Sequence, residues 1–161
     1  MPKEIYILSG AIKTGKTTKL LEFSLKHQDV YGILSPVSEG IRFFMDVHTK
    51  EEFPMESKPG SVSVFRVGKF SFDPGSFIKA TAIIREALNH KYGWLLIDEI
   101  GPLELNAEGF YEIVKEIING RSSLKILFVI RDYVLHQAID FFKMDSDNVH
   151  IIDTSSGILK N

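Results

Sequence analysis

A short segment near the amino terminus constrains the fold of this chain most. Gly10-Ala11-Ile12-Lys13-Thr14-Gly15-Lys16-Thr17 fits the pattern G-x-x-x-x-G-K-[ST] at every fixed position. An apolar stretch at residues 5–8 precedes the segment, and apolar residues with helical spacing follow it from residue 16 to about 27. The segment therefore predicts a phosphate-binding loop between a buried strand and a helix.

The fixed residues of this pattern each have a physical role. Backbone N–H groups can surround a phosphate only where side chains leave room, and glycine at positions 10 and 15 leaves that room. The amino-terminal end of the following helix attracts the anion. We expect Lys16 to reach the β- and γ-phosphate oxygens and Thr17 to ligate Mg²⁺. The residues predicted to bind the nucleotide are Gly10, Ala11, Ile12, Lys13, Thr14, Gly15, Lys16, Thr17 and Thr18.

Lys13 has two open interpretations within this loop. Its ammonium group either adds positive charge near the γ-phosphate or points into solvent. Thr18, which follows the loop, is placed to contact the α-phosphate.

Two consecutive acids follow a second apolar strand. Residues 94–97 are apolar, and Asp98 and Glu99 come directly after them. In proteins with a phosphate-binding loop, an acid at the end of a neighbouring strand holds the Mg²⁺ shell, and we assign that role to Asp98. Glu99 is predicted to orient or deprotonate the attacking water. The alternative for Glu99 is a cap or a salt-bridge partner in the next loop.

Phosphoryl transfer also needs a cation that neutralises the developing charge. Arg131 follows the apolar stretch at residues 124–130, and ligands of open α/β sheets bind at the carboxyl ends of strands. Arg131 is therefore a candidate, with an ion pair to Asp132 or another nearby acid as the alternative. Arg42 is a further candidate. The predicted catalytic residues are Lys16, Glu99 and Arg131.

Strand and helix patterns alternate along most of the chain, which predicts a mostly parallel sheet covered by helices on both faces. The expected strands are residues 5–8, 30–34, 94–97, 124–130 and 149–152. The expected helices are residues 16–27, from about 76 to 90, 107–118 and 133–142. Their predicted buried stripes include Leu20, Leu21, Phe23 and Leu25 in the first helix, and Phe77, Ile78, Ala82, Ile83 and Leu88 in the second.

The middle of the chain interrupts this alternation. Residues 41–47 and 62–67 have strand character between glycines and prolines, so residues 35–65 are expected to form a small hairpin insertion or a mobile loop. No linker or repeat divides the sequence, and we expect residues 1–161 to form a single domain.

Composition excludes several classes of site. The chain of 161 residues has no cysteine, which rules out disulfides and zinc-thiolate sites. The net charge is −2, and the sequence has neither a nucleic-acid motif nor an apolar run long enough to span a membrane. These features favour neither nucleic acid nor a membrane as a partner. We expect a cytoplasmic location, because the amino terminus has no signal-peptide pattern. A protein partner or a homo-oligomer stays open.

Histidines and phenylalanines are the remaining candidates for ligand contact. The five histidines have no metal-ligand spacing and are expected at the surface or at helix ends. The aromatic rings are expected to pack in the core or a lid, with stacking on a nucleobase as the alternative; they are Phe65, Phe70, Phe72 and Phe77.

Two further segments resemble a known family. Val67-Gly68-Lys69-Phe70 and Ile97-Asp98-Glu99-Ile100-Gly101-Pro102-Leu103-Glu104-Leu105, together with the loop at residues 10–17, are similar to the small P-loop nucleoside-triphosphatases of the THEP type. The resemblance implies a RecA-like three-layer α/β sandwich and slow, Mg²⁺-dependent hydrolysis of several nucleoside triphosphates, including ATP and GTP, to the diphosphate and phosphate. It implies that Glu104 supports the acidic loop or starts a helix.

Two other functions stay open at this point. A nucleotide-gated binding module would use slow hydrolysis to time a partner interaction, with residues 35–65 as its moving surface. A small-molecule kinase is the other alternative. Kinases of this fold usually carry an arginine-rich lid, whereas Arg121 and Arg131 are the only arginines after Arg85.

Overall fold

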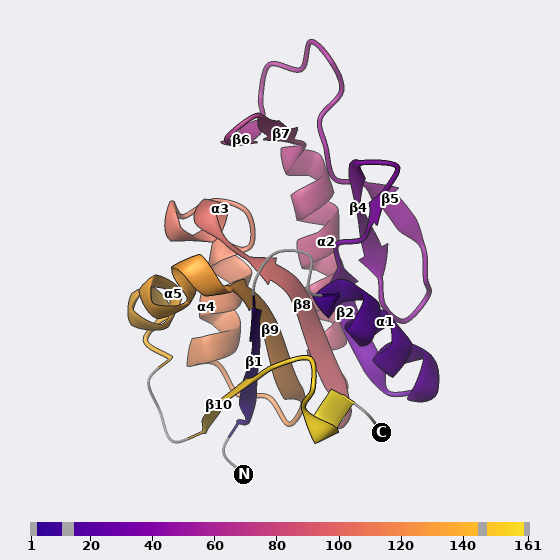
Figure 1. Ribbon diagram of the computed structural model, residues 1–161, viewed down its shortest axis with the longest axis vertical. Coiled ribbons are helices and arrows are strands. Elements are labelled where there is room, and N and C mark those ends of the chain that lie inside the picture. Colours follow the sequence, from indigo (N-terminus) through magenta and orange to yellow (C-terminus); the bar gives the residue numbers. More distant parts are fainter. Residues whose placement is uncertain (1–2, 11–14, 145–147, 160–161) are drawn as a thin grey trace.

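The computed structural model describes residues 3–10, 15–144 and 148–159. Within these ranges, one sheet of eight strands has the order β10-β1-β9-β8-β2-β4-β3, and β5 pairs with β4 (Figure 1). The strands of this sheet are β1 (Ile5–Gly10), β2 (Val30–Leu34), β3 (Val37–Ser38), β4 (Ile41–Asp46), β5 (Glu52–Pro54), β8 (Trp94–Ile100), β9 (Lys125–Arg131) and β10 (Val149–Ile152). A separate hairpin is formed by β6 (Phe65–Val67) and β7 (Phe70–Phe72).

Helices connect the strands of the main sheet. They are α1 (Lys16–Lys26), α2 (Pro74–Ala87), α3 (Pro102–Leu105), α4 (Tyr111–Asn119) and α5 (Leu135–Phe142), with short 3₁₀ turns η1 (Asp132–Val134) and η2 (Gly157–Leu159). Asp73 caps α2, because its carboxylate accepts the Gly75 N–H. No helix in the described ranges is long and apolar enough to cross a bilayer.

The five strands β10, β1, β9, β8 and β2 are parallel, and β4 runs antiparallel to β2. Residues 126–130 of β9 are all buried because this strand is covered on both faces. The predicted mostly parallel sheet and the predicted hairpin insertion after the second strand are therefore confirmed. The register pairs Gly10 with Arg131, which places the end of β9 beside the start of the phosphate-binding loop.

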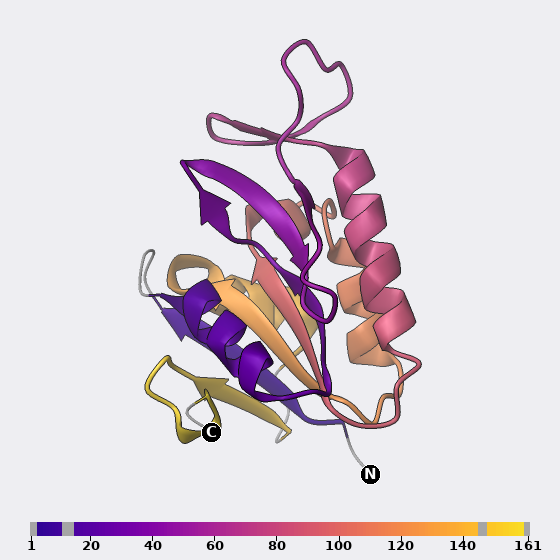
Figure 2. The same ribbon diagram turned by 90° about the vertical axis from the view of Figure 1, so that its right-hand side faces the viewer.

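Helices cover both faces of the sheet, which gives three layers. Figure 2 shows α1 and α2 on opposite sides. One core joins α2, α4 and α5 to side chains such as Ile7 and Phe128, and the other joins α1 and η2 to Leu8 and Leu127. Successive strand residues alternate between the two cores, as the twofold period of a strand requires.

Two predicted helical stripes are partly wrong. In α1, Leu20 and Phe23 are buried, but Leu25 is 69% exposed. In α2, Phe77 is buried, but Ile78 is 71% exposed, and the remaining contact face consists of Ala80, Ile84 and Ala87. The small alanine side chains let this helix lie close to the sheet. Which residues of α2 are buried therefore depends on how the helix packs, and not only on how hydrophobic each residue is.

Two predicted element boundaries also differ from the structure. The strand expected at residues 62–67 begins only at Phe65, and Val62 is 98% exposed. The helix expected from residue 107 begins at Tyr111, after the short helix α3 and a turn. In that turn Ala107 and Gly109 both have positive φ, which is incompatible with a continuous right-handed helix.

Candidate active site

The two ends of the phosphate-binding loop lie at the carboxyl edge of the sheet. Gly10 ends β1, and Gly15 precedes α1 with φ of 78°, a left-handed conformation that favours glycine. Lys16 is 8% exposed and its Nζ donates to the Gly10 carbonyl over 3.0 Å. Four predicted nucleotide-binding residues lie outside the described residues; they are Ala11, Ile12, Lys13 and Thr14.

Thr17 and Asp98 meet at this edge although they are far apart in the sequence. The Thr17 hydroxyl donates to Asp98 Oδ2 over 2.7 Å, and Asp98 is only 2% exposed. The same carboxylate oxygen accepts the Ser35 N–H over 3.0 Å, and the Ser35 hydroxyl donates to the Asp98 backbone carbonyl. The two residues predicted to hold the metal are thus brought together, with Ser35 as a third partner.

Sequence reasoning missed Ser35. It follows β2 directly, and β2 pairs with β8 in parallel register. One feature of the sequence could have indicated its role: Ser35 directly follows a strand whose carboxyl end lies at the same sheet edge as Asp98.

Burial is the largest influence on the Asp98 carboxyl and raises its pKa. Hydrogen bonds from Thr17 and Ser35, and the charges of Lys16 and Arg42, lower the pKa but do not cancel the effect of burial. A buried carboxylate is costly unless hydrogen bonds or a cation compensate its charge. One carboxylate and one hydroxyl at hydrogen-bond distance also form an oxygen donor set that suits Mg²⁺, which completes its shell with water and phosphate.

Glu99 and Arg131 form an ion pair beside this site. Arg131 Nε donates to Glu99 Oε1 over 2.8 Å, and their side chains are 19% and 23% exposed. The β8–β9 register passes from Asp98 opposite Val129 to Ile100 opposite Ile130, so Glu99 is an extra residue in β8. Such a bulge changes the direction of a side chain. Arg131 thus has the ion pair to a nearby acid that was its alternative, and Glu99 has a salt-bridge partner at the end of β9.

The pKa of Glu99 is raised, first by burial and then by the charge of Asp98, while Arg131 and Arg42 lower it. Burial lowers the pKa of the Arg131 guanidinium, but Glu99 and Tyr133 raise it overall. The site therefore holds two neighbouring acids with raised pKa values. The charge of Arg42 lowers the pKa of both acids, and the charge of Arg131 lowers that of Glu99.

These residues line one cavity of about 500 Å³, which we call the phosphate-site cavity. Thr18, Arg42 and Phe70 also line it. Arg42 comes from β4 of the predicted hairpin insertion, and its guanidinium carbon lies 5.5 Å from the centre of the Phe70 ring. Except for residues 11–14, the structure thus gathers every predicted nucleotide and catalytic residue at one edge of the sheet.

Glu104 supports the loop that follows Glu99. Its carboxylate accepts N–H groups from Gly101 over 2.8 Å and Phe110 over 2.9 Å, and the side chain is 3% exposed. Burial, opposed by these backbone hydrogen bonds, raises its pKa to about 7. A Cβ at Gly109 would lie 2.1 Å from Glu104 Oε2, so glycine at position 109 leaves room for this carboxylate.

The predicted aromatic set packs mainly in the interior. Phe72 and Phe77 are buried, and the Phe65 ring contacts Phe77 edge to face with centroids 5.4 Å apart. His90 stacks on the Tyr31 ring, and His48 contacts the same ring at a tilt. The described residues contain no cluster of three or more acidic or histidine side chains that could hold a metal ion.

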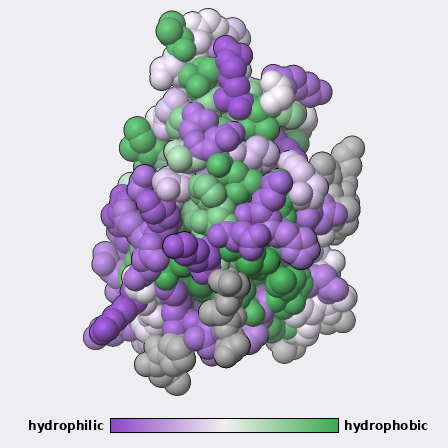
Figure 3. Space-filling model, turned by 90° about the vertical axis from the view of Figure 1, so that its left-hand side faces the viewer, coloured by the Kyte–Doolittle hydropathy of each residue, from purple (hydrophilic) through white to green (hydrophobic). Residues whose placement is uncertain are grey.

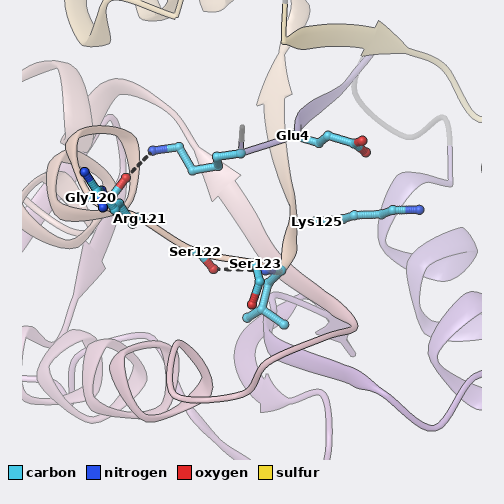
Figure 4. Close-up of a pocket in the computed structure, with 8 residues that line it drawn as sticks. Glu4, Gly120, Arg121, Ser122, Ser123 and Lys125 are labelled. Atoms are coloured by element: carbon cyan, nitrogen blue, oxygen red, sulfur yellow. Dashed lines mark hydrogen bonds between the residues drawn. The ribbon is translucent and has the colours of Figure 1, made fainter. Parts of the chain in front are cut away.

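A larger cavity, of about 880 Å³, lies at the opposite edge of the sheet (Figure 4). Its basic residues include Lys3, Arg121 and Lys125. Lys3 Nζ donates to the backbone carbonyls of Ile117 and Gly120, where it satisfies the end of α4. The cavity therefore contains structural contacts remote from the predicted catalytic residues.

Comparison with known proteins agrees with this architecture. A family model described as NTPase matches residues 5–155. The crystal structure of THEP1 from the hyperthermophile Aquifex aeolicus is similar with a TM-score of 0.74 and 19% identity, over 97% of this chain and 95% of that chain. The solution structure of a human cancer-related nucleoside triphosphatase gives a TM-score of 0.67 and 20% identity, over 99% and 93%. No curated protein matches the chain.

At these identities the two structures establish the fold, and the family model establishes the family. The fold is that of the P-loop NTPases, as the sequence predicted. Because the family match extends over nearly the whole chain, this protein belongs to the THEP-type NTPase family.

Proposed function

We propose that the protein hydrolyses nucleoside triphosphates, ATP and GTP among them, to the diphosphate and phosphate in a Mg²⁺-dependent reaction. The observation that carries the proposal is the 2.7 Å contact between Thr17, at the start of α1, and Asp98, at the end of β8. It joins a G-x-x-x-x-G-K-T segment to an acid at the same sheet edge, which is the arrangement that phosphoryl-transfer sites of this class require.

In this proposal, Thr17 and Asp98 hold the magnesium ion, which would neutralise charge on the phosphates. Backbone N–H groups of residues 10–15 bind the β-phosphate, and Lys16 binds its oxygens and those of the γ-phosphate. The distance of 3.0 Å from Lys16 Nζ to the Gly10 carbonyl supports this role, because it brings the ammonium group of Lys16 back to the first residue of the phosphate-binding loop.

Glu99 then orients the attacking water and accepts its proton. Water attacks the γ-phosphorus, the bond to the bridging oxygen breaks, and the diphosphate leaves. Arg131 has two roles in this step. It holds Glu99 through their ion pair, and its positive charge at the phosphate-site cavity stabilises the charge that develops on the phosphate.

A phosphate-release assay with the four ribonucleoside triphosphates tests this proposal. We expect Lys16→Ala to weaken nucleotide binding by at least about tenfold, since it removes a charge-assisted contact. We expect Glu99→Gln to retain binding and to lower kcat by about 10²–10⁴-fold. Lys19→Ala is the control, because Lys19 is on α1 but its side chain is 47% exposed. Full turnover in Glu99→Gln would exclude Glu99 as the base.

A nucleotide-gated binding module is the second candidate. Val37 and Ile41 are 57% and 48% exposed on the β3–β4 hairpin, and Val37 lines the phosphate-site cavity. A bound nucleotide would therefore contact an element with exposed apolar side chains. Under this alternative, the purified chain would bind Mg²⁺-nucleotide but would release phosphate only when a partner protein is added.

A further inference from the structure

A second cavity adjoins the phosphate-site cavity and is different in character. It has a volume of about 260 Å³, and we call it the aromatic cavity. Its apolar walls come from the β6–β7 hairpin, α2, α3 and the start of α4, and include Val67, Phe70, Phe72, Phe77, Leu103 and Phe110. No step of the proposed hydrolysis uses this space.

The two cavities meet at a set of shared lining residues: Arg42, Phe70, Glu99 and Arg131. A molecule in the aromatic cavity would therefore lie beside the residues that act on the γ-phosphate. The aromatic cavity differs in this respect from an ordinary packing void, which shares no lining residues with a reaction site.

The charges at this junction favour an anion. Three basic residues, Arg42, Lys69 and Arg131, line the aromatic cavity, against two acids, Glu99 and Glu104. The Glu104 carboxyl is turned to the Gly101 and Phe110 N–H groups, and burial raises its pKa to about 7, so the cations outnumber the anions near neutral pH. Arg131 is paired with Glu99, whereas Arg42 makes no ion pair among the described residues. The Arg42 and Lys69 cations each lie 5.5 Å from the centre of the Phe70 ring. Two positive groups are thus available where the apolar walls end.

The volume limits the size of the occupant. An engineered apolar cavity of about 150 Å³ holds one benzene molecule. A cavity of about 260 Å³ therefore has room for one ring and a short side arm. Phenylalanine walls suit a ring through offset-stacked and edge-to-face contacts.

We propose that the aromatic cavity binds a small aromatic carboxylate. Its ring lies among Phe72, Phe77 and Phe110, and its carboxylate pairs with Arg42 and Lys69 at the junction with the phosphate site. Because Glu99 and Arg131 line both cavities, binding of this ligand changes nucleotide turnover, and by linkage nucleotide binding changes its affinity. The binding stands on the cavity itself, whereas the effect on turnover rests on the proposed hydrolysis.

Four probes separate the contributions of ring and charge. Phenylacetate carries both, phenylacetamide lacks the charge, phenethylamine reverses it, and acetate lacks the ring. Their affinities for the nucleotide-free protein are measured by saturation-transfer NMR and calorimetry. We expect phenylacetate to bind at least about tenfold more tightly than each of the others, because a charge-assisted contact and ring burial are both needed. Equal binding of phenethylamine or acetate, or no binding of phenylacetate, would overturn the proposal.

Two substitutions on the same strand locate the site. Val67→Trp places a large ring in the cavity and is expected to abolish phenylacetate binding. Arg66→Trp adds the same ring at the neighbouring exposed position of β6 and is expected to retain binding. Arg42→Gln keeps the apolar walls and is expected to reduce the preference for phenylacetate over phenylacetamide to about twofold or less, since one charged partner is lost. Retained binding in a folded Val67→Trp protein would place the ligand elsewhere.

A turnover assay tests the coupling separately. Phosphate release from Mg²⁺-ATP is measured with and without saturating phenylacetate, and we expect a change of at least about threefold in kcat or KM. Val67→Trp should bring the ratio of the two rates to one, whereas Arg66→Trp should retain the effect. If the wild-type protein releases no phosphate at all, the hydrolysis proposal fails while the binding result stands. Phenylacetate that binds without altering measurable turnover would refute the coupling.

Discussion

Arg131 donates its Nε–H to Oε1 of Glu99 over 2.8 Å and so joins the carboxyl ends of β9 and β8. Both side chains are mostly buried, and both line the phosphate-site cavity. The pair links the residue proposed to orient water with the residue proposed to stabilise transferred charge. Their functions are therefore expected to depend on each other.

We predict that Arg131→Gln lowers kcat by about 10²–10³-fold with a small effect on nucleotide affinity, because it removes a charge near the transferred phosphoryl group. The pKa of Glu99 should also rise further, since the Arg131 charge lowers it. The acid limb of the pH–rate profile should then move to higher pH. Steady-state kinetics between pH 5 and 9 measure both effects.

The double variant Glu99→Gln/Arg131→Gln tests whether the two residues act as a unit. We expect its kcat to be close to that of Glu99→Gln alone, because residues that act together are not additive. Arg121→Gln is the control, since Arg121 is exposed at the opposite edge of the sheet. Multiplicative losses in the double variant would indicate independent roles.

A second prediction concerns the buried Asp98 carboxylate. Asp98→Asn should reduce Mg²⁺-dependent nucleotide affinity by more than about tenfold, because it removes the proposed anionic ligand. Without nucleotide, the same variant should be at least as stable as the wild type near pH 7. The reason is that burial raises the Asp98 pKa, which means that the ionised form is disfavoured in the fold. Magnesium titration and urea denaturation measure the two effects.

Thr17 and Asp132 provide the controls for this site. Thr17→Ser retains the hydroxyl that donates to Asp98 and should retain metal affinity, whereas Thr17→Val should lose it. Asp132→Asn removes an exposed acid next to the end of β9 and should leave metal affinity unchanged. Equal magnesium affinity in Asp98→Asn and the wild type would remove Asp98 from the metal site.

The sequence predicted the sheet well because its strands carry strong local signals. Residues 94–97 and 126–130 are continuous apolar runs, and the structure places them in β8 and β9 at the centre of the sheet. Exact helix faces were less predictable. Ile78 is apolar but faces solvent, because α2 contacts the sheet through Phe77, Ala80 and Ile84. Which face is buried depends on the position of the neighbouring strands, and a single segment does not contain that information.

In the candidate site, too, residues within a local sequence pattern could be predicted, whereas residues brought together only by the fold could not. The pattern at residues 10–17 and the acids at 98 and 99 are readable from spacing alone, and the structure gathers their described members at one edge. Ser35 and the aromatic cavity have no such pattern. Ser35 reaches Asp98 only because β2 is the neighbour of β8, and the cavity walls come from several separate elements.

A third prediction follows from the buried carboxyl of Glu104. Its pKa rises from 4.5 to about 7 in the folded protein, chiefly through burial. The resulting stabilisation is fully present below about pH 4.5 and is lost as pH rises through about 7. We therefore expect this group to lower the free energy of unfolding by about 3 kcal/mol between pH 4.5 and 7.5. Urea denaturation across this range measures the slope.

Glu104→Gln identifies the contribution of this residue to the slope. The variant has no titrating group at position 104, so its stability should vary less with pH than that of the wild type. It should be less stable at pH 5, because one of the two N–H groups from Gly101 and Phe110 loses its acceptor. Glu112→Gln, at an exposed position of α4, is the control and should retain the wild-type slope. Identical slopes in Glu104→Gln and the wild type would contradict the prediction.

The last prediction concerns the room that Gly109 leaves for Glu104. Gly109 has φ of 63°, and an added Cβ would lie 2.1 Å from Glu104 Oε2. Gly60 has φ of 83° but no atom within 4 Å of an added Cβ. Gly60→Ala should therefore cost only the left-handed strain of about 1–2 kcal/mol, whereas Gly109→Ala should cost about 2–4 kcal/mol because it also displaces a buried hydrogen-bond acceptor. Urea midpoints at constant m-value measure the difference, and a cost in Gly109→Ala no larger than in Gly60→Ala would mean that the loop after Glu99 does not depend on Glu104 for its position.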